Sequence, residues 1–126
     1  MPGQSTPEMD DSEFQLVMTS SDQRSVLERI ARELVEKRLA SCVQISGPVT
    51  SVYRWEGRIN SAEEYLATAK TCRSRIESVI RCVQASHNYS VPEIICVPVA
   101  AGANGYLDWI RQEVSGDPDE PFTPSD

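Results

Sequence analysis

The sequence predicts an α+β domain, in which an antiparallel sheet carries helices on one face. Three observations lead to this class. Apolar residues alternate with polar ones through the central stretch 41–71, as in strands with one buried face. Two other stretches, 26–35 and 76–83, repeat apolar residues at helical spacing. Short apolar runs at 14–20 and 94–99 supply two further strands.

The charge of the chain is concentrated at its two ends. The formal net charge is −7, and seven of the 19 acidic residues lie in 1–12 and 115–126, which contain no lysine or arginine. We therefore predict a disordered acidic tail at 1–12, a domain at 13–114 and a disordered, acidic, proline-rich tail at 115–126. Within the domain twelve acidic residues balance twelve basic ones. A neutral domain lacks the basic surface of a nucleic-acid-binding protein.

The first strand and helix are predicted for the N-terminal part of the domain. The apolar run from Phe14 to Ser20 is typical of a buried central strand. Ser21 or Asp22 can cap the helix that follows. Its apolar stripe is formed by Val26, Leu27, Ile30, Ala31, Leu34 and Val35.

A long hairpin is predicted for 41–71. In its first strand the odd-numbered positions carry apolar or aromatic residues: Val43, Ile45, Val49, Tyr53 and Trp55. In its second strand the odd-numbered apolar or aromatic residues are Ile59, Tyr65, Ala67 and Ala69. We expect each set to share a buried face. The chain reverses at Glu56-Gly57, where a glycine-bulge hairpin fits better than a type I′ turn.

The length of this hairpin predicts that it extends beyond its own domain. A strand from Arg58 to Lys70 spans roughly 43 Å at about 3.3 Å per residue, whereas a domain of about 100 residues has a radius of gyration near 13 Å. The edges of an overhanging hairpin carry unpaired hydrogen-bonding groups that invite another chain. We therefore expect self-assembly through this stretch.

The remaining elements complete the topology. A helix is predicted at about 74–85, a turn-rich loop at 86–93, a strand at 94–99 and a last helix at about 105–114. The resulting order, βαββαβ with an additional C-terminal helix, is the split βαβ or ferredoxin-like plan. Right-handed crossovers place both main helices on one side of the sheet, so we expect a neighbouring subunit to cover the other side.

Membrane and redox signals are weak in this sequence. No apolar run approaches the length of about 20 residues that a membrane span needs, and 1–12 lacks the features of a signal peptide. A cytoplasmic location is therefore expected. The cysteines, which occur without CxxC spacing, are expected to be mostly small buried hydrophobic residues: Cys42, Cys72, Cys82 and Cys96.

Catalytic motifs are absent from the sequence, which contains no P-loop, GxGxxG, GxSxG or HExxH pattern, and we expect a binding protein rather than an enzyme. His87, the only histidine, is either a loop residue or a metal ligand. Cys42 is either a core residue or a soft ligand for copper or zinc. Tyr53, Trp55 and Tyr89 are packing aromatics or a ligand platform. The charged residues on or beside strands pair across subunits or line a site: Glu63, Lys70 and Glu93.

Several separated motifs together resemble those of the CutA divalent-cation tolerance proteins. They are Arg38-Leu-Ala-Ser-Cys-Val-Gln-Ile, Val49-Thr-Ser-Val-Tyr-Arg-Trp-Glu-Gly, Lys70-Thr, Tyr89 followed by Val91-Pro-Glu-Ile, Pro98-Val and Tyr106-Leu-Asp-Trp-Ile. The resemblance extends from about Phe14 to Val114. It implies a homotrimer held by hairpin strands, an architecture similar to the PII signalling proteins, and association with copper and other divalent cations.

The resemblance also implies a site. It places a cleft between subunits near Cys42, Trp55, Glu63, Lys70, Tyr89 and Glu93. The metal ligands it implies are His87, where some members have two histidines, and Met18, where some have a cysteine. Ser90 stands where a glutamate is usual. Two functions follow as alternatives: a trimeric copper-binding tolerance protein, or a PII-like module that binds a small molecule or a protein in the cleft and binds metals incidentally.

Overall fold

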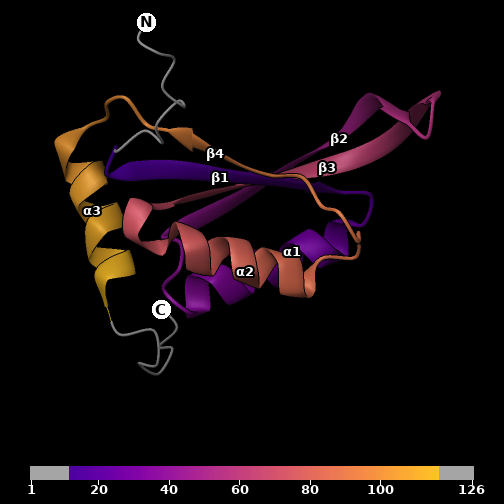
Figure 1. The fold of residues 1–126 in the computed structure, drawn as a ribbon. Helices are drawn as coiled ribbons and strands as arrows, with labels where there is room; N and C mark the ends of the chain where they lie inside the picture. Colours follow the sequence, from indigo (N-terminus) through magenta and orange to yellow (C-terminus); the bar gives the residue numbers. More distant parts are fainter. Residues whose placement is uncertain (1–11, 117–126) are drawn as a thin grey trace, which may run out of the picture.

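A computed structural model describes residues 12–116, which form one antiparallel sheet with three helices. The strands lie in the order β2-β3-β1-β4, and α1 and α2 lie side by side along one face (Figure 1). The elements are β1 (Phe14–Ser21), α1 (Arg24–Glu36), β2 (Cys42–Trp55), β3 (Arg58–Cys72), η1 (Arg73–Arg75), α2 (Ile76–Ser86), β4 (Ile94–Pro98) and α3 (Asn104–Ser115). This confirms the predicted ferredoxin-like α+β fold with an additional C-terminal helix. The two predicted tails lie outside the described residues, apart from positions 12, 115 and 116.

The main core lies between the sheet and the two long helices. The apolar stripe of α1 and that of α2 bury their side chains against Val17 of β1 and Ala69 of β3. Side chains alternate between the two faces of a strand, so the odd-numbered residues of β1 and β3 face the helices. We call the opposite face, which carries the even-numbered residues of these strands, the open face.

The start of α1 differs from the prediction. The residue before the helix is Gln23, and its side chain makes no capping hydrogen bond. Ser21 instead accepts a hydrogen bond from the backbone N–H of Gln23 at 3.0 Å, one step before the helix begins. Ser21 therefore shapes the entry to the helix and does not cap it, and Asp22 does not cap it either.

The C-terminal helix α3 packs at one end of the open face. Its Ile110 and Val114 form a second apolar cluster with Phe14 and Cys72. Arg75 holds the end of the helix, because its Nε donates to the carbonyl of Val114 at 2.7 Å and its guanidinium also donates to the carbonyl of Gly116 at 3.1 Å.

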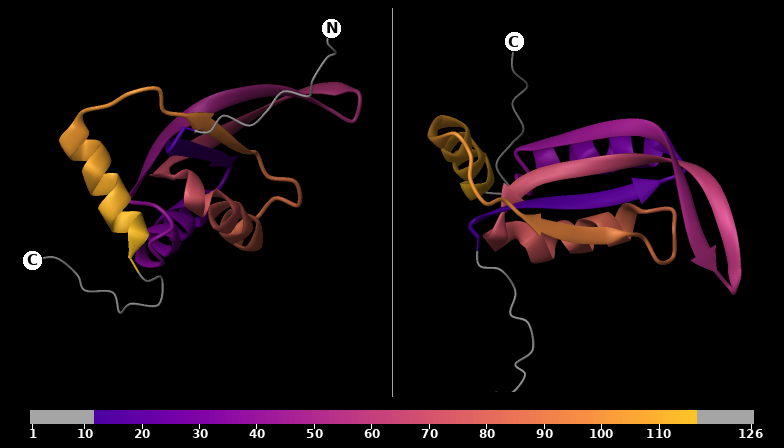
Figure 2. Two further views of the ribbon diagram at one scale, coloured as in Figure 1. Left: turned by 60° about the vertical axis from the view of Figure 1, so that its left-hand side comes forward. Right: turned by 90° about the horizontal axis from the view of Figure 1, so that it is seen from above.

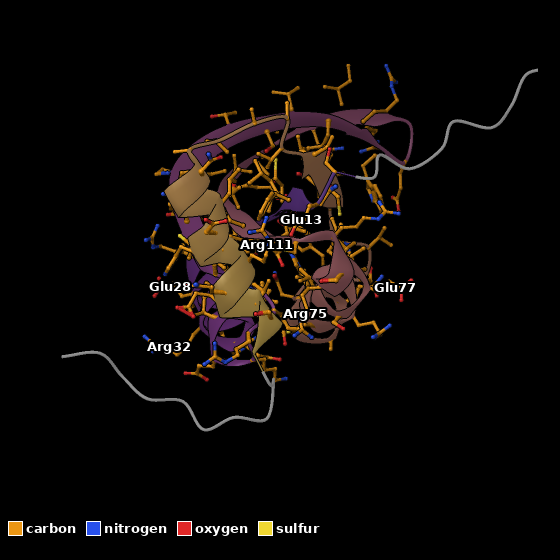
Figure 3. All side chains as sticks on the ribbon, turned by 90° about the vertical axis from the view of Figure 1, so that its left-hand side faces the viewer. Glu13, Glu28, Arg32, Arg75, Glu77 and Arg111 are labelled. Carbon is orange, nitrogen blue, oxygen red and sulfur yellow. The ribbon has the colours of Figure 1, made fainter. Side chains whose placement is uncertain are left out.

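An ion pair joins α3 to Glu13, the residue that precedes the first strand. Arg111 donates two hydrogen bonds to the carboxylate of Glu13, at 2.7 and 3.0 Å (Figure 3). These hydrogen bonds lower the pKa of Glu13 below its ordinary value. The helix is thus held to the sheet by apolar packing at its centre and by arginine contacts at its sides.

The β2–β3 hairpin extends beyond the helices, as its length predicted (Figures 1 and 2). Its strands contain 14 and 15 residues. The turn differs from the expected glycine bulge. Trp55 pairs directly with Arg58, and both residues between them have positive φ, 52° at Glu56 and 76° at Gly57. A two-residue turn with positive φ at both positions is of type I′, whose twist matches that of the strands.

A register shift divides β2 into two parts that face in opposite directions. Ser46 pairs with Leu66, but Val49 pairs with Glu64, so one extra residue is accommodated at Gly47-Pro48. Glycine is required there, because its φ is 130° and a β-carbon would lie 3.0 Å from the Tyr65 ring.

The shift overturns the prediction that one parity of β2 forms one face. Before the shift Val43 packs against the main core with the odd-numbered residues of β3. After it Tyr53 and Trp55 pair with the even-numbered Asn60 and Arg58, on the side of the open face. These two aromatic side chains are 44% and 57% exposed, so they are not buried within the chain.

The open face retains accessible apolar side chains. Ile95 and Val97 of β4 are 50% and 38% exposed, and Leu16, Met18 and Leu66 are half-buried. Of the four free cysteines, Cys72 and Cys82 are buried as expected, whereas Cys42 is half-buried and Cys96 is exposed. In the part of the chain that the structure describes, no helix is long and apolar enough to cross a lipid bilayer.

Candidate functional site

A cavity of about 610 Å³ opens beside the hairpin, and we call it the hairpin cavity. It lies between the far part of the hairpin, the end of β1 and the loop before β4. It is lined by Ser20, Ser51, Val52, Tyr53, Trp55, Glu64, Tyr89, Ser90, Val91 and Glu93. The lining thus combines two carboxylates with three aromatic rings, and it includes no lysine, arginine or histidine.

Glu64 and Tyr89 form a part-buried polar contact in the lining of the cavity. The Tyr89 hydroxyl donates to Glu64 Oε2 at 2.7 Å and accepts a hydrogen bond from the backbone N–H of Asp22 at 2.9 Å. Burial raises the pKa of Tyr89 well above its ordinary value, and the hydrogen bond to Glu64 raises it further. The phenol therefore stays protonated and holds the Glu64 carboxylate, which is only 9% exposed.

His87 fixes the loop that presents Tyr89. Its Nδ1 accepts the backbone N–H of Tyr89 at 3.0 Å, so Nε2 carries the proton and donates to the carbonyl of Ser20 at 2.8 Å. The neighbouring Asn88 accepts from the Ser21 hydroxyl at 2.7 Å and donates to Asp22 at 2.9 Å. Both ring nitrogens of His87 are thus engaged by the backbone in this conformation.

The residues predicted as metal ligands lie in different settings. Met18 is on the open face, between Thr68 of β3 and Ile95 of β4. His87 lies in the loop and makes the two backbone hydrogen bonds described above. Among residues 12–116, no three or more His, Cys, Asp or Glu side chains gather in a way that could hold a metal ion. The copper ligands therefore stay a prediction.

The residues predicted for the cleft fall in two places within one chain. Trp55, Tyr89 and Glu93 line the hairpin cavity. Cys42 and Lys70 pair across β2 and β3 at the other end of the hairpin, where Lys70 Nζ lies 3.2 Å from the hydroxyl of Tyr106 on α3.

Glu63 is exposed and does not line the cavity; its neighbour Glu64 does. Alternation along β3 was a usable signal for this difference, since it places Glu63 on the same side as Ala67 and Ala69 and Glu64 on the other. Tyr53, considered earlier only as a packing residue or platform, also lines the cavity. No comparable signal pointed to Ser20, which approaches the cavity from the end of β1.

These features define a class of small α+β proteins, ferredoxin-like domains whose central hairpin extends beyond the sheet and has a polar and aromatic cavity at its side. A family model described as "CutA1 divalent ion tolerance protein" matches residues 15–113. The chain belongs to this family.

Named relatives and solved structures agree with this assignment. The chain is 40% identical over 98 residues to the "Divalent-cation tolerance protein CutA" of Thermus thermophilus, covering 78% of this chain and 95% of the relative. It is 42% identical over 87 residues to "Protein CutA" of Homo sapiens, covering 69% of this chain and 49% of that protein. The chain thus spans about half the length of the human relative, and 53% of the Arabidopsis thaliana "Protein CutA, chloroplastic".

The fold is shared with solved structures of the same family. The CutA1 structure from Shewanella sp. SIB1 superposes with a TM-score of 0.81 at 33% identity and covers 85% of this chain and 100% of that one. The structure of the "Divalent cation tolerance protein (Cut A1)" from Thermus thermophilus superposes with a TM-score of 0.77 at 39% identity and covers 79% of this chain and 97% of that one.

Proposed function

We propose that the protein is a homotrimer that binds divalent cations, copper among them, and contributes to tolerance of these ions. Membership of the divalent ion tolerance family supports the type of function. The observation that carries the proposal is the lining of the hairpin cavity, where Glu64 and Glu93 supply two carboxylates without a basic residue among them. Carboxylate oxygens attract hard divalent cations. The role is binding rather than catalysis.

The trimer is supported by surfaces that one chain leaves accessible. Ile95 and Val97 expose apolar area on the open face, and Tyr53 and Trp55 expose aromatic rings on the overhanging hairpin. In such an assembly the neighbouring subunits cover these side chains, because contiguous exposed apolar surface marks an interaction site.

Light scattering tests the assembly. We expect about three times the chain mass of 14.0 kDa for the parent protein and a smaller species for Ile95→Lys. Val35→Lys is the matched control, since Val35 is 39% exposed on α1, away from the open face. A monomeric parent protein at micromolar concentration would refute the proposal.

For copper we propose His87 and Met18 as ligands, through imidazole nitrogen and thioether sulfur. His87 then has to release one of its two backbone hydrogen bonds. Calorimetric titrations with Cu(II), and with Cu(I) under reducing conditions, test this in the parent, His87→Ala and Met18→Leu. Asn88→Ala is the control, because it loosens the same loop and keeps the imidazole. Copper binding that is equally tight in His87→Ala and in the parent excludes His87 as a ligand.

A test of the carboxylate site uses metals that prefer oxygen ligands. We expect Mn(II) to bind the parent protein and to bind Glu93→Gln several-fold more weakly, since one carboxylate charge is lost. Glu63→Gln makes the same change outside the cavity and should bind as the parent does. Equal weakening in both variants would show a general charge effect and no site.

A second candidate function is a PII-like module in which the cavity binds a small molecule. The observation that favours it is the presence of Tyr53, Trp55 and Tyr89 in a cavity of about 610 Å³, a size typical of small-molecule sites. A bare metal ion requires neither the volume nor the rings. Metal binding would then be incidental.

A cytoplasmic location belongs to the same proposal. The four cysteines are all free, which suits a reducing compartment. Relatives occur elsewhere, since the Arabidopsis protein is named chloroplastic and the Archaeoglobus fulgidus structure is titled periplasmic. Fractionation of cells that express the full-length protein tests the location directly.

A further inference from the structure

Another cavity, of about 570 Å³, opens between the C-terminal half of α3 and η1, and we call it the arginine cavity. Its charged lining residues are three arginines and one glutamate: Arg73, Arg75, Arg111 and Glu13. Figure 3 shows Glu13, Arg111 and Arg75 lying between α3 and α2. The lining is therefore predominantly basic, in contrast to the acidic lining of the hairpin cavity.

The arginine cavity lies away from the surfaces on which the proposed trimer depends. The helix α3 is at the opposite end of the sheet from the hairpin turn (Figure 1). The lining includes no residue of β2 or β4 and none of the exposed side chains that support the trimer, which are Ile95, Val97, Tyr53 and Trp55. An assembly through the hairpin and the open face therefore does not require this cavity to be covered.

The positive charge of Arg75 is not matched by a carboxylate among the described residues. Its hydrogen bonds go to two carbonyl groups at the end of α3, at 2.7 and 3.1 Å, and these carry only a partial negative charge. Arg111, by contrast, pairs with Glu13 and with Asp108, which lies outside the lining. An excess of positive charge therefore remains at Arg75.

Arg75 is held in a fixed orientation and still has donors available. Its Nε and Nη2 donate to the two carbonyls, whereas no hydrogen bond of Nη1 is found among residues 12–116. A guanidinium carries more N–H groups than these two contacts use. An arginine whose orientation is already fixed loses little conformational freedom when it binds a ligand. Arg75 is thus prepared to donate to an anion.

The chemistry of the lining favours a phosphate group. The planar guanidinium matches the oxygens of phosphate, and a doubly charged anion gains more from an excess of positive charge than a single carboxylate does. The volume of about 570 Å³ is typical of small-molecule sites. A phosphate group therefore leaves room for an organic substituent beside Val114, which also lines the cavity.

We propose that the arginine cavity binds a small molecule that carries a phosphate group. Arg75 donates to the phosphate oxygens, Arg73 adds positive charge, and the charge of Glu13 limits the affinity. The site is separate from the hairpin cavity, and it depends neither on the proposed metal binding nor on the PII-like alternative.

The test compares phosphate esters that differ in charge. Calorimetric titrations of the full-length protein at low ionic strength use methyl phosphate, dimethyl phosphate and trimethyl phosphate, whose charges at about pH 7.5 are roughly −2, −1 and zero. We expect methyl phosphate to bind at least about tenfold more tightly than dimethyl phosphate, since it offers one more charged oxygen to the guanidinium groups. Trimethyl phosphate should not bind saturably.

Matched variants locate the binding. Arg73→Gln should weaken the binding of methyl phosphate by about threefold or more, because it removes a positive charge from the lining. Arg75→Lys should weaken it by a similar factor, because lysine keeps the charge but lacks the planar fork of N–H groups. Arg32→Gln makes the same charge change as Arg73→Gln at an exposed position on α1 and should bind as the parent does (Figure 3).

Glu13→Gln makes a prediction of the opposite sign. It removes the carboxylate from the lining and weakens the hold on Arg111, so methyl phosphate should bind about threefold or more tightly. A local folding defect does not produce a gain in affinity, so this variant tests the charge argument even if α3 is loosened. Glu28→Gln removes the same charge from α1 and should bind as the parent does.

The outcomes separate this inference from the proposed function. If trimethyl phosphate binds as tightly as methyl phosphate, or if no ester binds saturably below about 10 mM, the phosphate proposal is overturned. If Arg32→Gln weakens binding as much as Arg73→Gln does, or if Glu13→Gln leaves it unchanged, the binding is not in this cavity. None of these results alters the metal titrations or the light scattering, so the proposed function stands or falls separately.

Discussion

The turn of the hairpin offers a test of backbone conformation that is independent of any ligand. Glu56 has a φ of 52° and is followed by Gly57 at 76°. The left-handed region costs a residue with a β-carbon about 1–2 kcal/mol. Replacement by glycine removes this cost but adds freedom to the unfolded chain, which offsets up to about 1 kcal/mol. We expect Glu56→Gly to raise the free energy of unfolding by about 0.5–1 kcal/mol, and Glu56→Asn, which produces the favoured Asn-Gly turn, by a similar amount.

Urea unfolding at one fixed protein concentration measures this effect, because the stability of an assembled protein depends on concentration. Glu56→Ala is the control, since it removes the charge and the side chain but keeps the β-carbon, and we expect a change within about 0.5 kcal/mol of the parent. If the alanine variant gains as much as the glycine variant, the side chain and not φ is responsible. Unchanged stability in the glycine and asparagine variants would refute the reasoning about the turn.

Three further predictions concern the domain that carries the hairpin. Glu33 accepts hydrogen bonds from Cys82 at 3.1 Å and Lys37 at 3.0 Å, and these lower its pKa in the folded protein. The stability that Glu33 contributes is therefore fully present above its pKa in the unfolded chain, near about 4.3, and is lost as the pH falls through the lower pKa of the folded protein. Thermal unfolding should therefore show Glu33→Gln about 1 kcal/mol less stable at neutral pH, with a difference from the parent that shrinks as the pH falls below the unfolded value. Arg75→Met removes the two hydrogen bonds to the carbonyls of Val114 and Gly116, so it should speed amide hydrogen exchange at the C-terminal end of α3 and lower the free energy of local opening by about 2 kcal/mol. Unchanged exchange would show that Arg75 does not hold this end of the helix. Val79→Ala, at a fully buried position, should cost about 2 kcal/mol in urea unfolding, and a loss below about 0.5 kcal/mol would contradict its core position.

Most of the fold could be predicted because its periodic signals are strong and local. The stripe of α1 from Val26 to Val35 and that of α2 from Ile76 to Val83 each indicate one buried face, and the structure buries most of both stripes as expected. The hairpin length was also readable, because apolar alternation continues through both strands.

The details that were mispredicted depend on backbone geometry that no periodicity records. One residue of register shift at Gly47-Pro48 turned Tyr53 and Trp55 to the other face, and a glycine and a proline inside a strand pattern are the signals that could have indicated it. The turn at Glu56 was mispredicted because glutamate is uncommon at positive φ.

The candidate site was predictable only in part, because its residues come from separate strands and a loop. Trp55, Tyr89 and Glu93 were chosen from a resemblance and line one cavity. The prediction of Glu64 as a fourth lining residue would have required knowing which side of β3 faces the helices. The hydrogen bonds of His87 depend on the conformation of a loop, which sequence patterns do not specify.

The register shift in β2 has a consequence for how this strand can change over time. Val43 and Ile45, before the shift, lie against α1, whereas Tyr53 and Trp55, after it, line the hairpin cavity beyond the helices. The two halves of one strand can therefore evolve under separate constraints. Deletion of a single residue at Gly47-Pro48 would remove the extra residue and leave both halves in place, because Ser46 would still pair with Leu66 and Val49 with Glu64.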